Sequence, residues 1–299
     1  MVTQQTLIGS GVPRRVLGRH LRGLRIQAGL TVKAAAEALE WSEPKLWRIE
    51  TGQTAMRGLD VRAVCTVYGA SPELTSALAE LARQVRAGGW WHAYGEFIPD
   101  DFSVYAGLED EAAELLAYEC CQIPAPMRTE AYARTLIMTG HPGAGADEVD
   151  RLVDACLARR LLVTRARAPL TATVILTEAL VRCPVGGAQV MAGQLRHLAG
   201  LAGLPNVRIR VLPSNTGMHP GLMTGPFTLL RFPLRGQGRE PDPDTVYVGG
   251  LTGELYLDKP HEVRRYDDAF AAILDRSLDQ VASQDLLLTV AKELGQDTG

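Results

Sequence analysis

One short segment of the sequence gathers polar side chains that can form hydrogen bonds to the edges of DNA bases. Its members are Ser42, Glu43, Lys45 and Arg48. A lysine or an arginine can donate to O6 and N7 of guanine, and a glutamate can accept from N4 of cytosine. Such contacts require a helix that enters the major groove with its N-terminal residues facing the bases. We therefore expect these four residues to contact bases in double-stranded DNA.

Two further basic residues flank this segment. Lys33 lies near the start of the preceding predicted helix, and Arg57 follows the segment. Both are better placed for phosphates than for bases, and phosphate contacts position a protein on the duplex. The alternative is that all these charges are solvated on a small bundle used for protein contact.

The rest of the chain offers few motifs for catalysis. None of the six histidines lies at metal-ligand spacing from a cysteine, an aspartate or another histidine. The sequence also lacks a Gly-x-Ser-x-Gly motif, a phosphate-binding glycine loop and a dinucleotide fingerprint. We expect no enzyme activity, no metal and no cofactor, and an enzyme with an attached DNA-binding domain is the weakest alternative.

Three polar residues could contribute to an effector or partner site. Glu178 follows a predicted strand, where α/β sheets place ligand groups. His219 lies in a loop close to another strand, and Gln194 lies on a predicted helix. In the alternative interpretation, Glu178 caps a helical turn, Gln194 bonds the backbone and His219 orders a hairpin. Arg160, on an apolar helix face, is expected to pair with a carboxylate or to extend its charge to solvent.

The elements that position the base-reading segment form an all-α bundle. Apolar spacing and capping residues predict helices over 14–28, 31–39, 42–51, 59–68 and 71–86, with a tight turn at Glu40-Trp41. Ser42 and Thr31 are predicted N-caps. We expect Glu50 to bond within the bundle, and Trp41 and Trp47 to pack.

The remaining sequence predicts a mixed α/β domain. Helices are expected over 129–139, 147–167, 187–202, 261–279 and 283–294, and strands over 172–177, 207–212, 227–232 and 245–249. Residues 105–122 are ambiguous between strand and helix. The strand–helix–strand order over 172–212 predicts a parallel pair, with the later strands antiparallel.

Composition and charge support this division of the chain. Residues 1–86 hold twelve basic and seven acidic residues, whereas the remainder holds 19 basic and 27 acidic ones. We expect a disordered lead-in over 1–13, a DNA-binding domain over 14–86, a linker over 87–94 and the α/β domain over 95–294. An odd number of cysteines (five) without Cys-x-x-Cys predicts a reducing cytoplasm, and no apolar run is long enough for a membrane span.

The N-terminal segment resembles the Xre family of helix-turn-helix regulators, also called Cro/C1-type. Ser42, Leu46, Glu50 and Gly52 match the positions that this family uses in and after its recognition helix. The sequence departs from the family at Val32, where a glutamine is usual, and at Trp47, where a serine is common. The resemblance covers about residues 15–75 and implies DNA binding, with base preferences that cannot be copied from relatives.

The C-terminal segment resembles a domain of unknown function that follows Xre-type helix-turn-helices in actinobacterial, antitoxin-like regulators. The segments that carry the resemblance are Tyr118-Glu119, Ile123-Pro124, residues 129–134, residues 176–180, Gln194-Leu195, residues 211–213 and residues 219–227. The sequence departs from the family over residues 125–128, where Gly-Leu-Leu-Gln is usual. The resemblance implies a bacterial regulator, in some cases paired with a small protein encoded by a neighbouring gene.

Together these features predict a cytoplasmic, nucleoid-associated, sequence-specific transcriptional regulator. A homodimer on an inverted-repeat operator is expected, because one recognition helix reads few base pairs. The C-terminal domain would sense a ligand or bind the small partner. The alternative is an antitoxin-like adaptor whose main role is protein–protein interaction.

Overall fold

The computed structural model describes residues 12–52, 54–87, 104–233, 242–250 and 253–296. The chain divides into two compact units. Unit 1 comprises residues 1–108 and 249–259, and unit 2 comprises residues 109–248 and 260–299. The first eleven residues of the expected lead-in, and residues 88–94 of the expected linker, lie outside the described residues. Val12 and Pro13, expected in the lead-in, already belong to the first helix.

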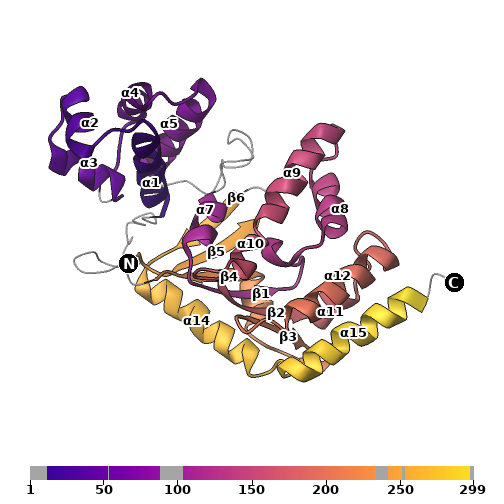
Figure 1. The fold of residues 1–299 in the computed structure, drawn as a ribbon. Coiled ribbons are helices and arrows are strands. Elements are labelled where there is room, and N and C mark those ends of the chain that lie inside the picture. The colour runs from indigo at the N-terminus through magenta and orange to yellow at the C-terminus, as the bar shows by residue number, and fades with distance from the viewer. Residues whose placement is uncertain (1–11, 53, 88–103, 234–241, 251–252, 297–299) are drawn as a thin grey trace. The chain divides into compact units, whose positions relative to one another are not determined.

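Unit 1 contains the five predicted helices in the predicted order (Figure 1). They are α1 (Val12–Gln27), α2 (Val32–Ala38), α3 (Glu43–Glu50), α4 (Gly58–Tyr68) and α5 (Pro72–Ala87). Helix α1 contacts α3, α4 and α5, while α2 packs on α3. Leu21, Leu46, Val61 and Leu78 are fully buried between these helices. The amphipathic pattern therefore closes into one apolar core, as the sequence predicted.

Two glycines allow α1 to approach the end of α3 closely. A Cβ atom on Gly18 would lie 2.4 Å from the carbonyl oxygen of Ile49. Gly52 has a φ of +71°, and a Cβ atom there would lie 2.6 Å from the Cα atom of Arg15. Side chains at these two positions would push α1 and α3 apart, so both helices depend on glycine for their packing.

The second part of the chain is built on a six-stranded sheet with the order β3-β2-β1-β4-β5-β6. The strands are β1 (Glu114–Glu119), β2 (Thr171–Thr177), β3 (Val207–Leu212), β4 (Phe227–Arg231), β5 (Thr245–Gly250) and β6 (Gly253–Leu257). Strands β1, β2 and β3 are parallel, whereas β4 is antiparallel to both β1 and β5. The predicted parallel pair and the predicted antiparallel strands are both confirmed.

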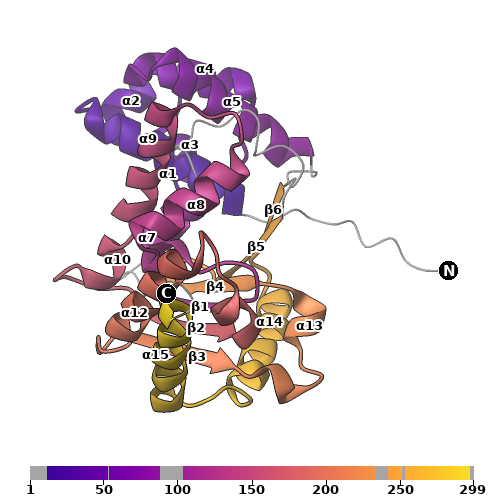
Figure 2. The same ribbon diagram turned by 90° about the vertical axis from the view of Figure 1, so that its right-hand side faces the viewer.

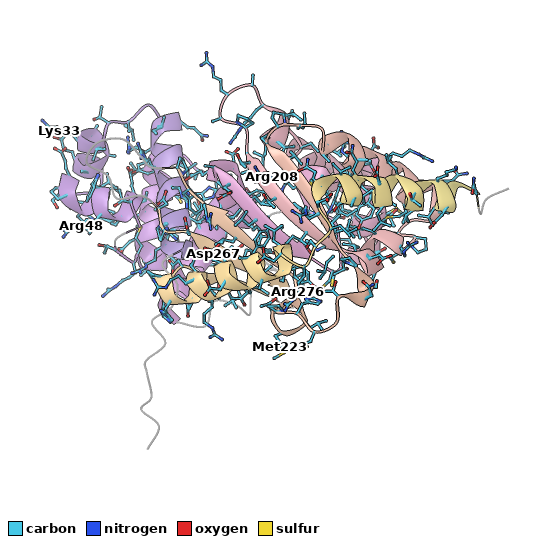
Figure 3. All side chains as sticks on the ribbon, turned by 90° about the horizontal axis from the view of Figure 1, so that it is seen from below. Lys33, Arg48, Arg208, Met223, Asp267 and Arg276 are labelled. Atoms are coloured by element: carbon cyan, nitrogen blue, oxygen red, sulfur yellow. The ribbon has the colours of Figure 1, made fainter. Side chains whose placement is uncertain are left out.

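Helices of unit 2 cover the strands and pack on one another. Helix α14 (Pro260–Leu274) contacts β1, β3 and β4, and α15 (Gln280–Gln296) contacts β3 and α12 (Ala188–Leu201). Figure 3 shows α14 and α15 crossing one face of the sheet. Helices α8 (Glu130–Gly140) and α9 (Ala146–Ala158) lie side by side in Figures 1 and 2.

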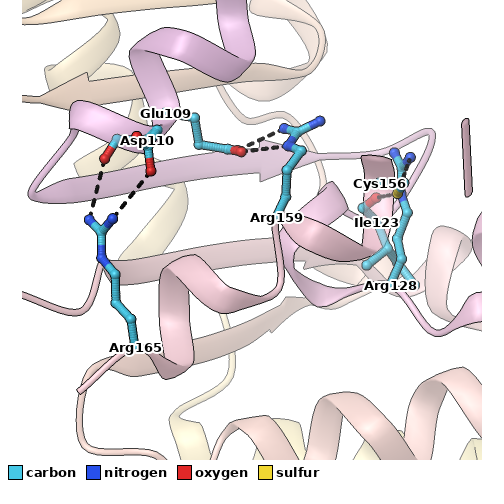
Figure 4. A network of polar contacts seen from close by, with 7 residues as sticks. All are labelled: Glu109, Asp110, Ile123, Arg128, Cys156, Arg159 and Arg165. Atoms are coloured by element: carbon cyan, nitrogen blue, oxygen red, sulfur yellow. Dashed lines mark hydrogen bonds and ion pairs between the residues drawn. The ribbon is translucent and has the colours of Figure 1, made fainter. Parts of the chain in front are cut away.

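Three segments differ from the sequence-based expectation, and one of them is the helix expected over 261–279, which ends at Leu274. The ambiguous region 105–122 contains helix α7 (Val104–Glu111) followed by β1. The helix expected over 147–167 is divided into α9 and the short α10 (Leu161–Thr164). Arg159 lies at the break and forms a bidentate ion pair with Glu109, with N–O distances of 2.6 and 2.9 Å (Figure 4). The pair is a long-range contact that periodicity does not reveal.

Several short elements were not predicted, among them η3 (Ser214–Thr216) and α13 (Gly221–Thr224). Helix α11 (Glu178–Arg182) begins directly after β2, with the Thr177 hydroxyl accepting from the backbone N–H of Leu180. The 3-10 helix η2 (Ala125–Met127) precedes α8. The expected strand set also omitted β6. Each of these elements has five residues or fewer, too few for a periodic pattern to identify.

Candidate nucleic-acid interface

Helices α2 and α3 form a helix-turn-helix pair with capped N-termini. The hydroxyl of Thr31 accepts from the backbone N–H of Ala34 at 3.1 Å, and the hydroxyl of Ser42 accepts from that of Lys45 at 3.4 Å. Glu40 adopts a φ of 54°, in the left-handed region, at the turn between the helices. The capping residues predicted from sequence are therefore confirmed, and they fix where α3 begins.

The six residues predicted to contact DNA are all exposed. They are Lys33, Ser42, Glu43, Lys45, Arg48 and Arg57. Figure 3 shows the side chains of Lys33 and Arg48 pointing away from the bundle. Four of the six lie in α3 or at its N-cap, so the structure brings them together on one short helix. Their role in reading bases and phosphates remains a prediction.

Local contacts orient two of the cationic side chains. The ammonium group of Lys45 lies 3.8 Å from the centre of the Trp41 ring, in cation–π contact. The Nε atom of Arg48 donates to the carbonyl oxygen of Pro44 at 3.3 Å, which leaves the terminal nitrogens of the guanidinium group for other acceptors. Both charges therefore stay on the solvent side of α3 without an acidic partner among the described residues.

The opposite side of α3 is fixed to the bundle. Leu46 and Ile49 are buried, and Glu50 is only 5 % exposed. Glu50 accepts two hydrogen bonds from Arg25 of α1, at 2.7 and 2.9 Å, and the hydrogen bond to Glu50 raises the pKa of Arg25. The predicted structural role of Glu50 is confirmed.

The prediction for Trp47 was wrong. Its side chain was expected to pack in the bundle, but it is 44 % exposed. Leu46 and Ile49 occupy the inward positions of α3, and Trp47 falls between them on the outer side of the helix. Trp41 is half-buried beneath Lys45. An exposed aromatic ring next to Arg48 adds a residue to the candidate interface that sequence reasoning assigned to the core.

In unit 2, Gln194 has a clear structural function. It is fully buried, and its amide nitrogen donates to the carbonyl oxygen of Met127 at 2.7 Å. Its amide oxygen accepts from the backbone N–H of Thr129 at 2.7 Å and from the Thr129 hydroxyl at 3.1 Å. These bonds join α12 to η2 and to the N-cap of α8, which agrees with the alternative in which Gln194 bonds the backbone.

Glu178, like Gln194, forms hydrogen bonds that join separate segments of unit 2. Its carboxylate accepts from the backbone N–H of Ser214 and from Arg182, both at 2.9 Å. The hydrogen bond from the Ser214 backbone, followed by that from Arg182, lowers the pKa of Glu178. Glu178 therefore fixes the loop after β3 to the start of α11.

His219 is the third of the predicted site residues. It is 8 % exposed, its ring lies 6.0 Å from that of Tyr118, and its Nδ1 atom has no hydrogen-bond partner among the described residues. Burial, followed by the nearby charge of Arg276, lowers its pKa. His219, Glu178 and Gln194 thus contact different partners, and a joint effector site remains a prediction.

The described part of the chain contains no cluster of three or more histidine, cysteine or acidic residues that could hold a metal ion. Within the same residues, no helix has the length and apolarity needed to cross a membrane.

The comparisons with known proteins identify two domains. Residues 16–78 match the model of a helix-turn-helix domain, which indicates DNA binding and, in coarse terms, a transcription regulator. Residues 102–289, more than half of the chain, match the model of a domain of unknown function, DUF5753. No curated protein and no solved structure shows a significant match. Behind its helix-turn-helix domain, the chain thus carries the mixed α/β domain of a second family, and it belongs to the DUF5753 family.

Proposed function

We propose that this protein is a sequence-specific transcriptional regulator of the Xre type, acting in the cytoplasm at the nucleoid of an actinobacterium. One observation carries the proposal. Helix α3 presents Ser42, Glu43, Lys45 and Arg48 to solvent at and after its N-terminus, while Arg25 and Glu50 fix its C-terminal end to the bundle. A rigidly held helix with exposed polar residues at its N-terminal end suits insertion into the major groove.

The charge distribution supports this proposal. The first 86 residues carry twelve basic and seven acidic side chains, although the whole chain has a formal charge of −3. Lys33 precedes α3 in the sequence and Arg57 follows it, and both side chains are exposed. Contacts of these two residues with phosphates would orient the helix on the duplex.

The regulator is proposed to act as a homodimer on an inverted repeat. One helix of eight residues contacts few base pairs, and two half-sites about one helical turn apart provide the remaining specificity. Unit 2 is proposed to act by binding, as a sensor of a small ligand or as a partner for a small protein encoded nearby, and not as an enzyme.

An antitoxin-like adaptor is the second candidate. The exposed apolar side chains of Met218, Leu222 and Met223, which lie close together in sequence around α13 (Gly221–Thr224), favour it, since clustered exposed apolar residues are typical of protein contacts. Co-purification of a small protein with the full chain, together with weak and unspecific DNA binding, would support the adaptor over the regulator.

The test is a duplex-binding titration over a salt series with the DNA upstream of the protein's own gene. The double variant Lys45→Ala/Arg48→Ala should lose preference for this DNA over random duplex. The matched control, Arg151→Ala/Arg208→Ala, also removes two positive charges from exposed positions, but in unit 2, and should bind as the wild type does. Binding by the wild type without salt dependence, or an equal loss in both variants, would contradict the proposal.

A further inference from the structure

A pocket of about 240 Å³ lies between η2, α10 and α12 in unit 2. Its walls are mostly apolar and include Pro126, Leu157, Val163 and Leu201. Three polar side chains also line it: Arg160 from the turn between α9 and α10, Thr164 of α10, and His197 from α12. An apolar pocket with a few convergent polar groups is the usual form of a small-molecule site.

One of these polar groups lacks the partner that a buried polar group normally has. The Nε2 atom of His197 is buried and has no hydrogen-bond partner among the described residues. Burial, followed by the charge of Arg160, lowers the pKa of His197, which favours the neutral ring. A buried nitrogen without a partner is costly unless something else binds it.

Arg160 differs in this respect from its neighbour in the chain. Arg159 forms a bidentate ion pair with Glu109, shown in Figure 4. In the described part of the chain, no carboxylate lies within ion-pair distance of the Arg160 guanidinium group. The sequence led us to expect a carboxylate partner or a solvated charge for Arg160, and its half-exposed side chain without a carboxylate partner agrees with the second alternative. The same side chain also lines the wall of the apolar pocket.

We propose that this pocket binds a small monocarboxylic acid with an apolar body. The planar guanidinium group of Arg160 matches a carboxylate in bidentate geometry. The Nε2 atom of His197 can donate one further hydrogen bond in the tautomer that carries its proton there. The apolar walls receive the hydrocarbon part of the acid.

Size and charge limit the ligand further. A volume of 240 Å³ accommodates about eight water molecules at ~30 Å³ each, which corresponds to an acid of roughly eight to ten non-hydrogen atoms. The only charged side chain in the wall is Arg160, so one negative charge is matched and the second charge of a phosphate monoester is not. A monocarboxylate therefore fits better than an organic phosphate.

The inference deepens the proposed sensing role, and its regulatory consequence rests on that proposal. The binding of the acid to the pocket does not depend on the proposed sensing role. The experiment is therefore done on the full chain without DNA, so that its failure would leave the DNA-binding proposal intact, and a failure to bind DNA would leave the carboxylate site intact.

The test is isothermal titration with hexanoate and benzoate as probes, and with hexan-1-ol and phenyl phosphate as controls. At least one of the two acids should bind at millimolar concentration or below, with each control at least tenfold weaker. Arg160→Met keeps an unbranched apolar stem and removes the guanidinium group with its charge, and should weaken the binding of the acid at least tenfold. Arg160→Lys keeps the charge but not the planar fork, and should give an intermediate loss.

Arg151→Met is the matched control, because Arg151 is an exposed arginine of α9 outside the pocket wall. It should bind the acids as the wild type does. A thermal unfolding curve identifies any variant that has lost its fold. The proposal is overturned if neither acid binds, if hexan-1-ol binds as well as hexanoate, or if folded Arg160→Met binds the acids unchanged.

Discussion

Arg25 and Glu50 form a buried, bidentate ion pair that joins α1 to the C-terminal end of α3. The exposed fractions of the two residues are 7 % and 5 %, and the N–O distances are 2.7 and 2.9 Å. The third hydrogen bond of Arg25 goes to the carbonyl oxygen of Leu30, at 2.8 Å, in the segment between α1 and α2. One guanidinium group therefore fixes α3 and the entrance to α2 at the same time.

The first prediction concerns this pair. Glu50→Ala should destabilise the N-terminal bundle by about 3–5 kcal/mol, because it leaves a buried arginine without its counter-charge. Urea unfolding followed by tryptophan fluorescence measures the loss, since all four tryptophans lie within residues 41–91. The control is Arg25→Met/Glu50→Leu, which removes both charges and should lose less than Glu50→Ala. Equal losses would show that packing, not the unpaired charge, accounts for the effect.

The second prediction compares two glycines of the same helix. Gly18→Ala places a Cβ atom 2.4 Å from the Ile49 carbonyl oxygen and should destabilise the bundle and weaken DNA binding together. Gly23→Ala has nothing within 4 Å of the new atom and should stabilise α1 by about 0.5–1 kcal/mol, through helix propensity. The urea midpoints of the two variants should therefore move in opposite directions. A shift of the same sign would contradict the close approach of α1 and α3.

The third prediction concerns the exposed ring of Trp47. Trp47→Ala should change the free energy of unfolding by less than about 0.5–1 kcal/mol, because the side chain is 44 % exposed. It should nevertheless weaken binding to the upstream DNA, since Trp47 is exposed on the helix proposed to enter the groove. Leu46→Ala is the contrasting variant, because Leu46 is fully buried and its truncation should cost about 2–5 kcal/mol. A large loss of stability in Trp47→Ala would assign the ring to packing after all.

Local signals account for most of what could be predicted from the sequence. The helices of unit 1 follow from apolar spacing at three and four residues and from the caps Thr31 and Ser42, which act through contacts with residues nearby in the chain. Strands β2 and β3 were predictable because their β-branched and alternating patterns reflect burial in a sheet. The exposed placement of the candidate residues of α3 was predictable for the same reason, since they lie on one capped helix.

The features that the sequence did not reveal depend on contacts between distant residues. The break after α9 coincides with the ion pair of Arg159 with Glu109, 50 positions earlier in the chain. The hydrogen bonds of Gln194 reach η2 and the N-cap of α8, about 65 positions away, which no spacing rule connects. The pocket of Arg160 and His197 likewise joins residues from different helices, and neither residue belongs to a motif.

The last prediction concerns pH. Burial, followed by the charge of Arg19, lowers the pKa of His20 in α1 from 6.5 to about 4. Between pH 6.5 and pH 4 the unfolded chain therefore binds a proton that the folded bundle does not, and the free energy of unfolding must fall as the pH falls. The contribution is fully present above pH 6.5 and is lost, on the order of 3 kcal/mol, by about pH 4.

His20→Leu removes the titrating group, so the difference in the free energy of unfolding between this variant and the wild type should shift in favour of the variant as the pH falls from 6.5 to 4. His141→Leu, at an exposed position, is the control and should follow the wild type. Parallel pH profiles for wild type and His20→Leu would show that His20 is protonated in the folded bundle as readily as in the unfolded chain.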